Sequence, residues 1–333
     1  MKKKRLAGKV ALVAGATRGA GRGIACALGE AGAIVYCSGR STREHAATPG
    51  RKETIDDTAE MVNARGGTGI AVPTDHRDAA QVRSLIDRIR DEHGRLDVLV
   101  NDIWGGDAWL DWWFKIWRFW DIPLEKGFDV LNTAVFTHIN TAHAAIPLML
   151  ATKGGGLIVE VTDGDGYYYR GQFYYDFVKT SVIRMAMAWA HELRRHHIAS
   201  IAVTPGFLRS ESVLDIMHVS ETNWRDAVKR YPEFAESETP FFVGRAIAAV
   251  AADRHRMKKT GSVFNSFELA NEYGIDDVDG RRPHVWPLLD GKYGYKKLDD
   301  AFYSYCGYDA AEMEKLLSDI DADVNLSASE ARS

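Results

Sequence analysis

Cysteine is scarce in this chain, which has only Cys26, Cys37 and Cys306, spread over its length. Their odd number and wide spacing argue against a metal site and are typical of a reducing compartment. Long apolar runs are missing as well, since Val10 to Ala14 is too short for a signal-peptide core and no run approaches a membrane span. The net charge of -4 gives no reason to expect nucleic acid as a partner. We therefore expect a soluble, cytoplasmic protein.

The chain is long enough for a sizeable core, with 333 residues of which 46% are hydrophobic and 26% charged. No internal repeat or low-complexity linker divides it, so we expect one domain over residues 1–285. Residues 286–333 are predicted to form a C-terminal extension whose last residues are disordered.

Short apolar runs alternate with helical patterns through the first part of the chain. Strands are predicted at Val10–Ala14, Ala33–Ser38, Gly69–Pro73 and Leu96–Val100, with helices between them. This alternation with short loops predicts an α/β fold of the Rossmann type, a doubly wound parallel sheet. Ligands of such sheets bind beyond the carboxyl ends of the strands.

A glycine-rich turn joins the first strand to a helix predicted over residues 24–31. Gly15, Gly19 and Gly21 would let the backbone turn tightly and approach a pyrophosphate at the helix N-terminus. Thr17 lies within the same turn. Because the turn stands between a strand and a helix, it favours a dinucleotide cofactor over a plain tight turn.

The cofactor is expected to be NADP(H). The second strand ends at Gly39-Arg40-Ser41, where an acidic residue would bind the ribose hydroxyls of NAD. Arg40, together with Arg18 of the glycine turn, would present two guanidinium groups to a 2'-phosphate, unless both are merely solvated. By position, Asp75 could reach the adenine, and Asn101 could help hold the loops around the cofactor.

Tyr175 and Lys179 lie four residues apart at the start of a helical pattern that runs to Leu193. On a helix they would face the same cleft, and the ammonium would lower the pKa of the phenol from its ordinary value of about 10. Tyr175 would then be a usable acid or base. The pair is weak support by itself, since exposed helix faces often carry such pairs.

Taken together, these motifs resemble those of the short-chain dehydrogenase/reductase family. The resemblance covers residues 6–285 and includes the glycine turn, Asp75, Asn101, the pair Tyr175 and Lys179, and Pro205-Gly206 after a strand at Ser200–Val203. Within the family, Ala270 to Arg282 is similar to the branch that contains dehydrogenase/reductase family member 1.

The resemblance implies the chemistry of the site. The tyrosine matching Tyr175 exchanges a proton with the substrate oxygen, and the lysine matching Lys179 binds the nicotinamide ribose. Hydride would pass between C4 of the nicotinamide and a carbonyl or carbinol carbon. Family habit implies a homodimer or homotetramer. The family's nicotinamide loop is matched by Pro205, Gly206, Leu208 and Ser210, the last standing where threonine is usual.

The chain departs from the family where a serine normally donates to the substrate oxygen. The usual spacing of twelve residues before Tyr175 falls on Asp163, which Thr162 precedes. An ionised carboxylate only accepts hydrogen bonds and would repel negative charge that develops on that oxygen. Asp163 could be protonated by burial, Thr162 could replace the serine after a one-residue shift, or the substrate could be cationic, such as an iminium. Asp163 could also simply cap the following turn.

A second departure concerns an asparagine that in many relatives anchors a water for the lysine. The usual position falls on Ala134, and Asn132 lies two residues earlier on a different part of the helix surface. The asparagine's role is therefore not carried over.

The segment Trp104–Trp120 is rich in tryptophan. In this fold it borders the substrate side of the nicotinamide and could wall a large apolar pocket, although a subunit interface or a membrane contact is a rival explanation. A mobile lid over about residues 207–240 is expected to set substrate choice. The predicted pocket residues are Trp104, Trp109, Trp113, Tyr167, Phe173, Phe207 and Met217.

The leading expectation is an NADPH-dependent oxidoreductase that reduces the carbonyl of a bulky apolar substrate, with Tyr175 as proton donor. Two alternatives stay open. One is imine reduction or other chemistry assisted by Asp163, and the other is an NADP-binding protein without turnover.

Overall fold

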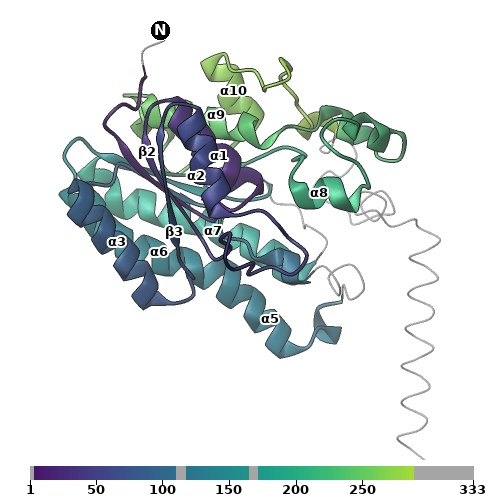
Figure 1. Ribbon diagram of the computed structural model, residues 1–333, viewed down its shortest axis with the longest axis horizontal. Coiled ribbons are helices and arrows are strands. Elements are labelled where there is room, and N and C mark those ends of the chain that lie inside the picture. The colour runs from purple at the N-terminus through teal and green to yellow at the C-terminus, as the bar shows by residue number, and fades with distance from the viewer. Residues whose placement is uncertain (1–3, 110–117, 165–171, 289–333) are drawn as a thin grey trace, which may run out of the picture.

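Seven strands form one parallel sheet in the order β3-β2-β1-β4-β5-β6-β7 (Figure 1). The computed structural model describes residues 4–109, 118–164 and 172–288. The order confirms the predicted doubly wound sheet, with crossovers to either side of β1. The strands are β1 (Val10–Ala14), β2 (Ile34–Gly39), β3 (Thr68–Pro73), β4 (Val98–Asn101), β5 (Gly156–Val161), β6 (Ile198–Thr204) and β7 (Val263–Asn265).

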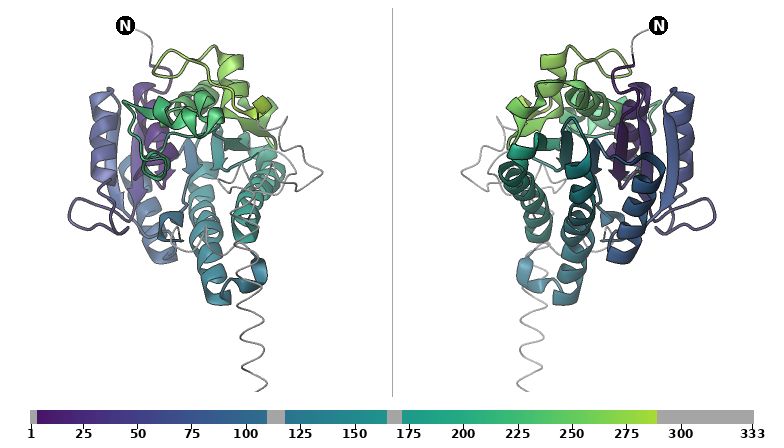
Figure 2. Two further views of the ribbon diagram at one scale, coloured as in Figure 1. Left: turned by 90° about the vertical axis from the view of Figure 1, so that its right-hand side faces the viewer. Right: turned by 90° about the vertical axis from the view of Figure 1, so that its left-hand side faces the viewer.

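Helices cover both faces of the sheet (Figure 2). They are α1 (Gly19–Glu30), α2 (Ile55–Ala64), α3 (Ala79–His93), α5 (Leu124–Leu131), α6 (Thr137–Ala151), α7 (Phe173–Leu193), α8 (Glu211–Ile216), α9 (Pro240–Ala252) and α10 (Ser266–Tyr273). A π-helical turn, Asn132–Phe136, joins α5 to α6.

Strand β1 contributes to two separate cores because alternate side chains point to opposite faces. Ala11 and Val13 of β1 pack with residues of α1, α2 and α9, whereas Val10 and Leu12 pack with residues of α3 and α6. All four side chains are buried. Burial on both faces explains why the strands are continuous apolar runs rather than alternating ones.

Helix α1 begins at Gly19 rather than at residue 24, where the apolar pattern starts. The extra turn ends at Gly23, where α1 packs closely against α9. A Cβ added at Gly23 would lie 1.9 Å from the carbonyl oxygen of Pro240, and one added at Gly244 would lie 2.5 Å from the carbonyl oxygen of Gly23. Close backbone contact therefore replaces the apolar side chains by which a helix start is normally recognised.

The stretch Leu124–Ala151 is one continuous helical run of 28 residues. By length and composition it could cross a membrane, which departs from the expectation that no run approaches a span. Half of its apolar window is buried within the fold, and Ala142 and Leu148 belong to the core beneath the sheet. Core helices meet the same criterion, so packing within the fold accounts for the buried half of this stretch.

Candidate active site

The glycine turn follows β1 and brings α1 against the loop after β4. Gly15 has a φ of +91°, and a Cβ added there would lie 2.3 Å from the carbonyl oxygen of Asp102. A Cβ at Gly21 would lie 2.3 Å from the carbonyl oxygen of Gly15. Only glycine fits at these two positions. The glycines therefore allow close packing beneath the turn, and Gly15 and Gly19 line the cleft at the start of α1, where the pyrophosphate of a dinucleotide would bind.

A cleft of about 520 Å³ extends from the glycine turn across the strand ends to α7. Gly21 and Asn101 are not among its lining residues. Asn101 is buried and its amide donates to Glu160 at 2.6 Å, so it can act on the cofactor only through the loops it supports. Thirteen predicted cofactor residues do line the cleft: Gly15, Thr17, Arg18, Gly19, Arg40, Ser41, Asp75, Tyr175, Lys179, Pro205, Gly206, Leu208 and Ser210.

Three arginines gather where the cleft passes β2 and β3. Arg40 is half-buried, and burial lowers the pKa of its guanidinium, with further lowering by the charges of Arg77 and Arg18. Arg77 was not predicted; it pairs with Asp75 at 2.7 Å. Arg18 donates to Thr48 at 3.0 Å. The sequence signal for Arg77 is its place two residues after Asp75, at the same strand end.

Tyr175 and Lys179 lie in the first turns of α7 and line the cleft. The Tyr175 hydroxyl donates a hydrogen bond to Asp163, in the loop after β5. The Lys179 Nζ lies 4.4 Å from the ring centroid of Trp104 and 5.6 Å from that of Tyr175. Gln172 accepts a hydrogen bond from the Tyr175 amide at 2.9 Å, and this cap fixes where α7 begins. The residue at the usual serine position is thus in direct contact with the tyrosine.

Thr162 also lines the cleft, but its hydroxyl donates to the backbone carbonyl of Lys179 at 2.7 Å. Asp163, the next residue, has a different partner, the Tyr175 hydroxyl. The hydroxyl of Thr162 therefore ties β5 to α7. A direct role for it in catalysis stays a prediction, and one that requires this hydrogen bond to break.

A buried ion pair supports the loop after β4. His138 of α6 is hydrogen-bonded through Nδ1 to Glu160 of β5 and donates through Nε2 to the carbonyl of Ile103 at 3.0 Å. Burial favours the neutral ring, but the charge and hydrogen bond of Glu160 outweigh it and raise the pKa of His138. Sequence reasoning missed this pair; the signal was an acidic residue within an apolar parallel strand. Ala134, at the usual asparagine position, is buried in the π-helical turn nearby.

Aromatic side chains form part of the wall beside Lys179. Trp104 and Phe207 line the cleft. Trp109 is buried behind Trp104, with ring centroids 5.4 Å apart, and so supports the wall without lining the cleft. Phe173 is half-exposed beside Phe119, and Met217 packs within the lid. Neither is among the lining residues. The other two predicted pocket residues, Trp113 and Tyr167, lie outside the described residues.

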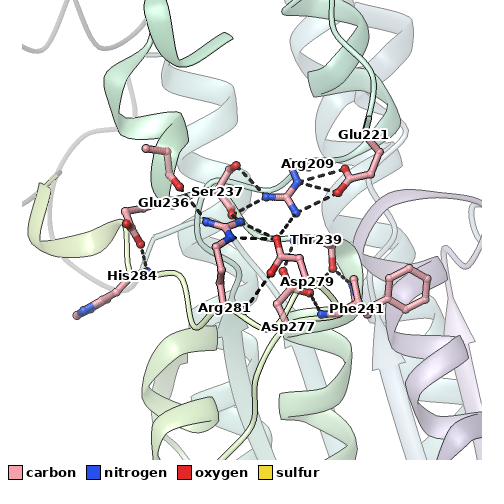
Figure 3. Close-up of polar contacts among 12 residues, drawn as sticks. Arg209, Glu221, Glu236, Ser237, Thr239, Phe241, Asp277, Asp279, Arg281 and His284 are labelled. Carbon is pink, nitrogen blue, oxygen red and sulfur yellow. Dashed lines mark hydrogen bonds and ion pairs between the residues drawn. The ribbon is translucent and has the colours of Figure 1, made fainter. Parts of the chain in front are cut away.

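The lid predicted over about residues 207–240 is held by Arg209, which lies within the nicotinamide loop (Figure 3). Its fully buried guanidinium donates to Glu221 at 3.1 Å, to Asp279 at 3.2 Å and to the Ser237 carbonyl at 2.8 Å. A buried charge is costly unless it is paired. The network therefore fixes the lid against the loop that follows α10.

Two ion pairs hold α8 across the cleft. Glu211 accepts a hydrogen bond from the Gly19 amide at 2.8 Å and pairs with Arg22 of α1 at 3.1 Å. Arg51, in the loop after β2, pairs with Asp215 at 2.5 Å. Helix α8 is thus tied to α1 and to the loop after β2.

Comparison with known proteins agrees with this geometry. The family model described as short chain dehydrogenase matches residues 9–218. The chain belongs to the short-chain dehydrogenase family. Over 277 residues it is 34% identical to "Dehydrogenase/reductase SDR family member 1" of Mus musculus, covering 82% of this chain and 84% of that protein.

Other relatives of this short-chain dehydrogenase are more distant. It is 28% identical over 250 residues to "7alpha-hydroxysteroid dehydrogenase" of Clostridium sardiniense, covering 75% of this chain and 88% of that protein. The crystal structure of a short-chain type dehydrogenase/reductase from Mycobacterium marinum shares the fold with a TM-score of 0.63 at 25% identity. The alignment covers 79% of this chain and 95% of the Mycobacterium marinum chain. The resemblance inferred from the motifs, including the family member 1 branch, is confirmed.

As in other short-chain dehydrogenases, the cleft residues fit NAD or NADP, which supplies the hydride chemistry when bound. The glycine turn fits the pyrophosphate, and Pro205 to Ser210 close the opposite side. Tyr175 holds a proton at its hydroxyl, and Lys179 brings a positive charge to the same wall. Within the described ranges, no group of three or more His, Cys, Asp and Glu side chains could hold a metal.

Proposed function

We propose that this short-chain dehydrogenase uses NADPH to reduce the carbonyl of a bulky apolar substrate, with Tyr175 as proton donor. The observation that carries the proposal is that Tyr175 and Lys179 line the same cleft as the glycine turn. A hydride donor held against that wall and a phenol proton beside it are the two parts that such a reduction needs.

NADPH is proposed over NADH because of the arginines beside β2 and β3. Arg18, Arg40 and Arg77 all line the cleft, and guanidinium groups match the geometry of phosphate. Asp75 is already paired with Arg77, so it is a poor partner for ribose hydroxyls. The net positive charge at the end of the cleft beside β2 and β3 favours a 2'-phosphate.

An apolar substrate is supported by Trp104 and Phe207 in the wall of the cleft. The similarity to a hydroxysteroid dehydrogenase is consistent with a large ring compound. A cytoplasmic location is proposed from the sparse cysteines, of which Cys26 and Cys37 are free thiols.

A homo-oligomer is proposed from apolar side chains left exposed on contacting helices. Leu124 and Phe128 of α5 are each 58% exposed, and Phe136, Phe177 and Met187 are about half-exposed. Exposed apolar residues grouped on neighbouring helices are typical of subunit interfaces.

The proposal is tested by cofactor titration and turnover. Intrinsic tryptophan fluorescence should report tighter binding of NADPH than of NADH, and NADPH oxidation should then be followed with apolar ketones. Tyr175→Phe should keep NADPH binding and lose turnover by a factor on the order of 10³. Tyr273→Phe, which removes the hydrogen bond that Tyr273 of α10 donates to Asp253 at the end of α9, is the matched control. Turnover unchanged in Tyr175→Phe would exclude Tyr175 as proton donor.

A further inference from the structure

Asp163 places a carboxyl group beside the tyrosine that would exchange a proton with the substrate. It lines the cleft and accepts a hydrogen bond from the Tyr175 hydroxyl. The neighbouring hydroxyl, that of Thr162, is directed to the backbone of Lys179. The residue beside the proton-donating tyrosine is thus a carboxylate, which in its ionised form can only accept hydrogen bonds.

Asp163 shares this wall of the cleft with another carboxyl and with an amine. Asp102 also lines the cleft, and its carboxyl accepts a hydrogen bond from the Gly21 amide. The amine is that of Lys179, whose Nζ lies over the Trp104 ring.

Reduction of a carbonyl places negative charge on the substrate oxygen in the transition state, which a neighbouring carboxylate destabilises. When an iminium ion is reduced to an amine, the reacting nitrogen group changes from a cation to a neutral amine and never becomes an anion. A carboxylate favours the protonated imine and keeps it next to the hydride site.

We propose that Asp163 makes the site favour a carbon–nitrogen double bond, so that the enzyme also reduces a bulky apolar imine, as its iminium ion, and does so faster than the carbonyl compound of the proposed function. This inference rests on the proposed function, because it uses the same NADPH site and the same Tyr175. Asp163 is assigned as a specificity-determining residue that pairs with the iminium N–H.

The proposed reaction balances without a further reactant. The imine nitrogen first takes a proton from the Tyr175 hydroxyl. A proton from bulk water then restores that hydroxyl. Hydride from NADPH then carries two electrons to the imine carbon and forms a C–H bond. The C=N π pair becomes the lone pair of the nitrogen, and the products are a neutral amine and NADP⁺.

The test compares two probes of similar shape, the ketone α-tetralone and a dihydroisoquinoline imine. For the wild-type enzyme we expect a kcat/KM for the imine at least about tenfold above that for the ketone. Asp163→Ser should reverse this order, lowering the imine value and raising the ketone value by about tenfold each. Asp163→Asn, which keeps the shape and removes the charge, should move both values in the same directions.

The controls separate this inference from the proposed function. NADPH binding by tryptophan fluorescence must be retained in each Asp163 variant, and Tyr273→Phe must behave as wild type. Tyr175-dependent reduction of the ketone without reduction of the imine would overturn the assignment of Asp163 and leave the proposed function standing. Oxidation of NADPH by neither probe, despite binding, would overturn both.

Discussion

Replacing Asp102 by asparagine should stabilise the fold, and more so at alkaline than at acidic pH. Burial raises the pKa of the Asp102 carboxyl from its ordinary value of 3.8 to about 7, although the charge of Lys179 and a hydrogen bond from the Gly21 amide oppose the rise. The folded chain therefore holds this proton more tightly than the unfolded chain, and ionisation of the carboxyl disfavours folding.

The size of the effect follows from that difference in pKa. Between 3.8 and about 7 the folding penalty of the ionised carboxyl reaches roughly 4 kcal/mol. Because Asp102 borders the open cleft, solvent screening should leave about half of this, or ~2 kcal/mol. The penalty is absent below the unfolded-state pKa, grows as the pH rises through this window, and is complete above about pH 7. Asp102→Asn should thus gain ~2 kcal/mol near pH 8 and less than half of that near pH 5.

The assay is urea unfolding followed by tryptophan fluorescence, without cofactor, near pH 5 and near pH 8. Asp91→Asn on the exposed face of α3 is the matched control, because it removes a carboxylate that folding leaves in water. A gain for Asp102→Asn that is equal at both pH values would refute the reasoning, since the cause could not then be ionisation. A gain of the same size in the control would refute it as well.

Three further predictions concern other parts of the fold. Gly23→Ala should lower the free energy of unfolding by about 1–3 kcal/mol or more, because the new methyl group collides with the Pro240 carbonyl; an unchanged urea midpoint would contradict this. Arg40→Ala should reduce the ratio of kcat/KM for NADPH over NADH about tenfold, through lost charge-assisted hydrogen bonds, and an unchanged ratio would remove Arg40 from phosphate binding. Arg209→Met should speed hydrogen exchange of the lid amides, whereas Arg225→Met, which removes an exposed guanidinium over the same Trp224 ring, should not.

The sheet could be read from the sequence because its strands are buried on both faces. Val10–Ala14 was predicted with the bounds that the structure has. Helix Ala79–His93 also carries clear local signals, since Asp78 caps its start and Gly94 ends it in the left-handed region. The start of α1 could not be read, because its glycines are required by backbone contacts, of Gly21 with Gly15 and of Gly23 with Pro240 of α9. Local patterns reveal elements that bury apolar side chains, and they miss those shaped by backbone contact.

In the site, positions could be predicted but pairings could not. Motif spacing placed most cofactor residues on the cleft. It did not show that Asp75 pairs with Arg77, that Thr162 bonds to the backbone of α7, or that Glu160 pairs with His138. Each of these contacts joins segments whose relative placement depends on side-chain geometry. The role of Asp163 was left open for the same reason, and its contact with Tyr175 gives it a definite partner.

The ion pairs that tie α8 to α1 and to the loop after β2 should influence how long a cofactor stays bound. Ser212, Val213 and Ile216 of α8 line the cleft, so we expect this helix to move when a bound nucleotide leaves. Asp215 is largely exposed, and pairs of this kind weaken as ionic strength rises. Salt should therefore shorten the residence time of the nucleotide. Where release limits the catalytic cycle, higher salt would speed turnover while weakening affinity, so the ionic strength of its surroundings would set the balance between the two.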